Sequence, residues 1–276
     1  MINKLIELFS FEFVVYAFIV GILIAVCTAL LGVELVLKKY SMLGDGLSHV
    51  SFGTLAVAMV FNFAPLEFAL ICVLIVAFLL LRISRNSKIN GDAAIAMVSG
   101  SFLALGIFIS RVSGGFNQNL NDYMFGSIYA IKDSDLPLCI VMTVTVIIVY
   151  ALFYNKIFAV TFDEDFAKAA GAKVELYNLI LALLTAITVV IGMKLIGTLL
   201  ISSLTVFPVV SSLKLAKRYK TAVCCSVGIS LFAFIVGFVL SCLYDNMPLS
   251  TAVIFVNLIV YLVITLFTAI KKRKRI

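Results

Sequence analysis

Long apolar stretches separated by short polar segments follow one another along the whole chain. We place nine of them near residues 11–37, 43–62, 66–82, 93–111, 136–158, 176–196, 197–213, 219–243 and 249–270. Most are about as long as a helix that crosses a membrane, and they lack the alternation of barrel strands. The pattern predicts an all-α, polytopic transmembrane helical bundle, with residues 1–276 forming a single domain.

The number of spans depends on how residues 176–213 are divided. The stretches 176–196 and 197–213 are separated only by the short segment 193–197 (MKLIG). Either Gly192 to Gly197 forms a tight external turn between two full spans, or one stretch is short, broken or re-entrant. We therefore expect about eight spans, possibly nine.

Composition narrows the class of protein further. Hydrophobic residues make up 63% of the chain and charged residues 13%, with a mean hydropathy of +1.20. Soluble domains average about 45–50% apolar and about 25% charged residues. So few charges cannot cover the surface of a soluble protein of this size. An intrinsically disordered chain is excluded as well, because disorder requires low hydrophobicity. The composition therefore predicts an integral membrane protein.

Basic residues give the expected orientation of the chain in the bilayer. The net charge is +7, and alternating spans place 17 of the 21 lysine and arginine residues on one side. The four on the other side are Lys4, Arg111, Lys132 and Lys194. Because cytoplasmic loops carry the excess of positive charge, this distribution places the N-terminus outside and the C-terminus inside. It also explains the charge without a nucleic-acid partner, and we expect none.

The polar stretch with the clearest chemistry lies at the start of an apolar segment. Asp45 and His49, the single histidine of the chain, are four residues apart and so share one helix face, with Ser48 beside them. Ionisable groups inside a membrane segment are costly and mark functional sites. Carboxylate with imidazole suits zinc, manganese or iron. A helix-packing ion pair and a proton relay are the alternatives.

Three stretches resemble one family over roughly residues 10–265. Residues 35–49 (LVLKKYSMLGDGLSH) are similar to the signature of the metal-uptake ABC importer permeases of the zinc, manganese and iron type. Residues 162–171 (FDEDFAKAAG) resemble the cytoplasmic element of these permeases, and residues 197–208 (GTLLISSLTVFP) resemble a later membrane segment. The chain has no Walker A motif, so ATP hydrolysis is expected from a separate subunit.

The resemblance implies a transport subunit, not an enzyme, in the cell membrane of a prokaryote. The transported ion would be a divalent transition metal, with zinc as the first choice and manganese or iron as alternatives. The resemblance implies no tightly bound cofactor. It assigns Asp45 and His49 to the metal pathway. Residues 162–173 would couple to the ATPase, through Asp163, Glu164, Asp165 and Phe166. The implied partners are two ATPase subunits, an extracellular metal-binding protein and a second copy of the chain. A proton-coupled secondary transporter using Asp45 and His49 is the rival.

The sequence departs from the family pattern at four positions. Gly46 and Val50 replace alanines, which predicts looser local packing, and Glu164 replaces a proline. Glu34 stands where an apolar or aromatic residue is common. It precedes Lys38 by four residues, which predicts an ion pair on one helix. A role for Glu34 in transport is the second candidate.

Overall fold

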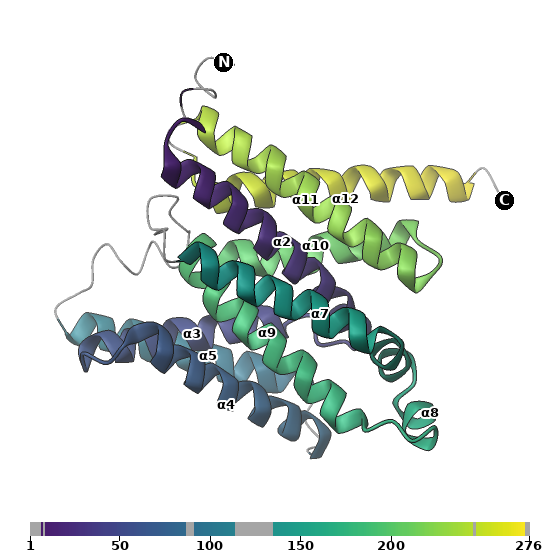
Figure 1. Cartoon of the computed structure of the whole chain (residues 1–276), viewed down its shortest axis with the longest axis horizontal. Helices are drawn as coiled ribbons and strands as arrows, with labels where there is room; N and C mark the ends of the chain where they lie inside the picture. Colours follow the sequence, from purple (N-terminus) through teal and green to yellow (C-terminus); the bar gives the residue numbers. More distant parts are fainter. Residues whose placement is uncertain (1–6, 8, 87–90, 114–134, 245–246, 274–276) are drawn as a thin grey trace.

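The computed structural model describes residue 7 and residues 9–86, 91–113, 135–244 and 247–273, and their regular structure is entirely α-helical (Figure 1). The helices are α2 (Glu12–Leu37), α3 (Leu43–Val60), α4 (Pro65–Asn86), α5 (Gly91–Val112), α7 (Asp135–Phe162), α8 (Glu164–Ala169), α9 (Val174–Ile196), α10 (Thr198–Leu215), α11 (Tyr219–Leu243) and α12 (Leu249–Arg273). The predicted helical bundle is confirmed.

Nine helices in the described part of the chain are long and apolar enough to span a membrane, the upper of the two expected numbers. The doubtful stretch is divided at Gly197, which alone separates α9 from α10. Its φ of 90° and ψ of 155° lie where only glycine is found routinely, so the turn needs no further residues. The tight turn is therefore the correct alternative.

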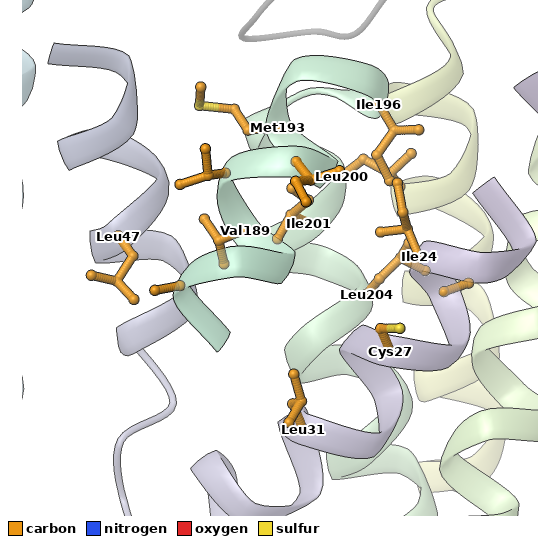
Figure 2. Packing of buried hydrophobic residues seen from close by; sticks show 14 of the residues in the cluster. Ile24, Cys27, Leu31, Leu47, Val189, Met193, Ile196, Leu200, Ile201 and Leu204 are labelled. Carbon is orange, nitrogen blue, oxygen red and sulfur yellow. The ribbon is translucent and has the colours of Figure 1, made fainter. Parts of the chain in front are cut away.

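Helix α10 lies in the interior of the bundle, where it packs against α2, α3, α9, α11 and α12. Figure 2 shows Ile24 of α2 beside Leu204 of α10, and both side chains are fully buried. Lipid is as apolar as these side chains, so close fit and dispersion hold the helices together more than hydrophobic burial does.

Helix α3 is fixed in place by an unusually close contact with α5. A Cβ atom built on Gly53 would lie 2.3 Å from the carbonyl oxygen of Phe102, and one built on Gly106 would lie 2.8 Å from Gly53 Cα. The two helices therefore touch through their backbones, which small residues alone permit.

The short helix α8 marks one end of the bundle. In Figure 1 it lies at the same end as the final turns of α12, opposite the start of α2. Lys38, between α2 and α3, contacts α8 through Glu164. This arrangement places the α2–α3 connection, α8 and the C-terminal end of α12 on one side, as the basic residues predict for the cytoplasmic side.

Candidate metal-pathway site

Asp45 and His49 lie one turn apart on α3, as their spacing predicts, with 3.6 Å between Asp45 Oδ2 and His49 Nε2. Their side chains are partly accessible, 36% for Asp45 and 23% for His49. The other residues from 43 to 56 are all buried. This part of α3 is thus accessible only through its one carboxylate and its one imidazole.

A serine on α10 completes the immediate surroundings of the carboxylate. The hydroxyl of Ser202 donates a hydrogen bond of 2.6 Å to Asp45 Oδ1, which leaves Oδ2 directed toward His49. Ser48, the weaker candidate from the sequence, is fully buried, and its hydroxyl donates to the backbone carbonyl of Asp45 at 2.7 Å. Ser202 was missed because only the fold brings α10 to this side chain.

The packing around Gly46 corrects one expectation. A Cβ atom at this position would lie 2.4 Å from Ile95 Cγ2, and Val50 is fully buried. The two departures from the motif alanines therefore accompany close packing beside the carboxylate, and the looser packing expected there is wrong. Glycine lets α5 approach α3 at the position directly after Asp45.

The four residues expected to couple to an ATPase lie on α8 and at its N-cap. The carboxylate of Asp163 caps the helix by accepting a 2.9 Å hydrogen bond from the backbone N–H of Phe166. Glu164 and Asp165 follow in the first turn and are exposed, as is Phe166 at 66%. An aromatic ring presented at the end of the bundle, beside three acids, is a surface suited to a partner protein.

Glu34 does not form the expected pair with Lys38. Its buried carboxylate on α2 accepts hydrogen bonds from Tyr150 at 2.8 Å, from Thr161 and from Tyr219. The amine of Lys38 instead contacts Glu164 at 2.8 Å. The backbone N–H of Lys38 still bonds the carbonyl of Glu34, so the pair fails because other helices supply partners to both side chains. Both helices α7 and α11 supply donors that the local sequence of α2 cannot indicate.

Across the described residues, no group of three or more His, Cys, Asp and Glu side chains converges as metal ligands. Asp45 and His49 are therefore a pair of candidate ligands without a third such side chain beside them in the described part of the chain. A multi-pass helical membrane protein with a carboxylate–imidazole pair on an otherwise buried helix is the class that this fold and site define.

Residues 10–268 match the ABC 3 transport family, and the chain belongs to this family. Among its relatives, the manganese import system permease protein ScaB of Streptococcus gordonii is 29% identical over 99% of this chain and 98% of the relative. The high-affinity zinc uptake system membrane protein ZnuB of Haemophilus influenzae is 27% identical over 86% and 90%. The solved structure of PsaBC from Streptococcus pneumoniae in complex with Fab superposes with a TM-score of 0.84, at 26% identity over 96% and 95%. The resemblance found in the sequence is thereby confirmed.

Proposed function

We propose that the chain is the membrane subunit of an ATP-driven importer of a divalent transition metal, with Asp45 and His49 as ligands of the ion in transit. The observation that carries this proposal is the accessibility of these two side chains on a helix that is otherwise buried from residue 43 to 56. The names of the relatives, which include both manganese and zinc transport, support a metal ion as the substrate.

Zinc is the first candidate among the ions, because imidazole with carboxylate suits it. The 3.6 Å between Asp45 Oδ2 and His49 Nε2 brings both atoms within reach of one ion. Manganese or iron would use the same pair.

The partners follow from the same residues. Two ligands leave a tetrahedral ion half coordinated, and a second copy of the chain would supply a second pair. Two ATPase subunits would dock on the α8 surface, where Phe166 is exposed, and an extracellular metal-binding protein would deliver the ion. ATP hydrolysis belongs to the docked subunits, and α8 would receive their motion.

The proposal is tested by uptake of ⁶⁵Zn²⁺ and ⁵⁴Mn²⁺ into cells that carry Asp45→Ala or His49→Ala. Both variants should reach the membrane in normal amounts and lose uptake, because each removes one of two ligands. Asp92→Ala is the matched control, since it removes an exposed carboxylate from the first turn of another span, α5. Normal uptake by both site variants would refute the ligand assignment. Competition by unlabelled Zn²⁺, Mn²⁺ and Fe²⁺ then ranks the ions.

The docking surface is tested separately by co-purification with the ATPase subunit. Phe166→Ala should lose the ATPase while the chain stays folded, because the ring is 66% exposed and supports no buried contact. Phe61→Ala, a similarly exposed ring that follows α3 at the opposite end, should retain it. Retention of the ATPase by both variants would exclude Phe166 from the contact.

A further inference from the structure

Lys38 has surroundings unlike those of a lysine in a surface loop. Its side chain is only 8% exposed, although it is the first residue beyond α2. The amine donates to Glu164 Oε1 at 2.8 Å and to Asn178 Oδ1 at 2.6 Å, and Asn178 Nδ2 donates to the same oxygen of Glu164 at 3.0 Å. We call these three residues the Lys38 clamp. A closed triangle of charged hydrogen bonds holds its members in one geometry.

The Lys38 clamp joins α8 to the end of α2. Helix α8 packs on α7 and α9, with Ala167 buried against Val160 and Val174. Through Glu164, the clamp adds a bond from α8 to the end of α2, and through Asn178 a bond to α9. A displacement of α8 therefore acts on the α2–α3 connection directly.

The last turn of α2 is also held by a second set of hydrogen bonds, to α7 and α11. Glu34, one turn before Lys38, is fully buried and accepts hydrogen bonds from Tyr150 and Thr161 of α7 and from Tyr219 of α11. A helix end that is held in this way does not fray. A displacement at Lys38 is thus passed along the chain and is not absorbed within α2.

The connection from Lys38 to Asp45 is short, and backbone hydrogen bonds hold it at several points. The N–H of Tyr40 donates to the carbonyl of Leu35 at 2.8 Å, and the N–H of Leu43 donates to the carbonyl of Tyr40 at 2.9 Å. Helix α3 begins there, and Asp45 lies in its first turn, seven residues after Lys38. Only four residues, 39–42, lie between Lys38 and the start of α3, so there is little slack between the clamp and the carboxylate.

We propose that Lys38 is a positioning residue that transmits displacement of α8 through the α2–α3 connection to Asp45. The inference rests on the proposed function, because it gives the motion of an ATPase-docking helix a defined path to the metal ligands. Glu164, the partner of Lys38, occupies the position at which the resembled cytoplasmic element has a proline. A proline cannot accept the bond from Lys38.

Three variants of the full chain test the proposal. Lys38→Met removes the clamp cation, and Lys39→Met removes the neighbouring, exposed charge as a matched control. The reversed pair Lys38→Glu with Glu164→Lys restores opposite charges, and Asn178 can bond either arrangement because its amide both donates and accepts. Each is assayed for ⁶⁵Zn²⁺ uptake in cells and, in lipid nanodiscs, for amide hydrogen exchange at residues 38–45 and 164–169.

Lys38→Met should speed exchange in both segments and lower uptake by about tenfold or more, the factor expected from losing a hydrogen bond between charged groups. Lys39→Met should change neither. The reversed pair should restore slow exchange in both segments, and it is judged by exchange because Glu164 also belongs to the proposed ATPase-docking surface. Equal exchange at residues 38–45 in Lys38→Met and Lys39→Met would overturn the proposal, whatever the uptake. Absence of uptake by the unchanged chain would instead refute the proposed function, while the exchange data still decide the role of Lys38.

Discussion

The contact between α3 and α5 at Gly53 gives the sharpest prediction for stability. A Cβ atom there would lie 2.3 Å from the carbonyl oxygen of Phe102, whereas ordinary contact begins at 3.4 Å. That oxygen belongs to the backbone of α5, so no side-chain rotation can relieve the clash. In Gly53→Ala the two helices must separate by about 1 Å, and a gap of about 0.5–1 Å forfeits about a quarter to a half of each dispersion contact.

Overpacking of this kind costs about 1–3 kcal/mol, and a backbone clash lies at the upper end. Against this cost, replacing a helical glycine by alanine stabilises the helix by about 1 kcal/mol, because alanine has the higher helix propensity. Gly100→Ala in α5 measures that gain alone, because nothing lies within 4 Å of a Cβ atom at that position. We therefore expect Gly53→Ala to be less stable than Gly100→Ala by about 2–3 kcal/mol.

The measurement is the free energy of unfolding of the full chain in detergent, from denaturant titrations of the two variants and the unchanged chain. Zinc uptake by Gly53→Ala should fall as well, because α3 carries Asp45 and His49. Equal stability of Gly53→Ala and Gly100→Ala would show that α3 and α5 do not approach through their backbones. The packing argument would then be wrong.

Three further predictions concern polar groups elsewhere in the bundle. Ser202→Ala should lower metal uptake about tenfold or more, because a hydrogen bond to a charged group contributes about 1.5–3 kcal/mol to holding Asp45; normal uptake would remove Ser202 from the site. Asp163→Ala should destabilise α8 by about 0.5–2 kcal/mol through loss of its N-cap, seen as faster amide exchange there. Lys194→Met should destabilise the chain by about 1.5–3 kcal/mol, because it removes a charged hydrogen bond of 2.7 Å to the buried Asp135, and thermal unfolding in detergent checks this.

The positions of the spanning helices followed from the sequence because each apolar run must satisfy its backbone within one helix. The stretch near 93–111 becomes α5 (Gly91–Val112), and that near 136–158 becomes α7 (Asp135–Phe162). The proximity of Asp45 and His49 also followed from the sequence, because residues four apart on a helix share a face wherever that helix lies.

Contacts between distant helices could not be predicted in this way. Ser202 lies 157 residues from Asp45, Glu164 lies 126 from Lys38, and Tyr219 lies 185 from Glu34. Each partner is an ordinary polar residue in its own segment, and only packing brings it to the charge. The expected Glu34–Lys38 pair was wrong for this reason, because a rule for one helix ignores donors supplied by its neighbours.

In a membrane bundle, hydropathy does not reveal which helix face carries such contacts. In a soluble protein, the apolar face of a helix points inward, whereas lipid and protein interior are equally apolar here, so hydropathy does not distinguish the faces. Small and polar residues retain the information: Gly53 marks where α5 meets α3, and Ser202 marks the face of α10 that meets Asp45. An inward face in such a chain is therefore better predicted from its glycines and serines than from its leucines.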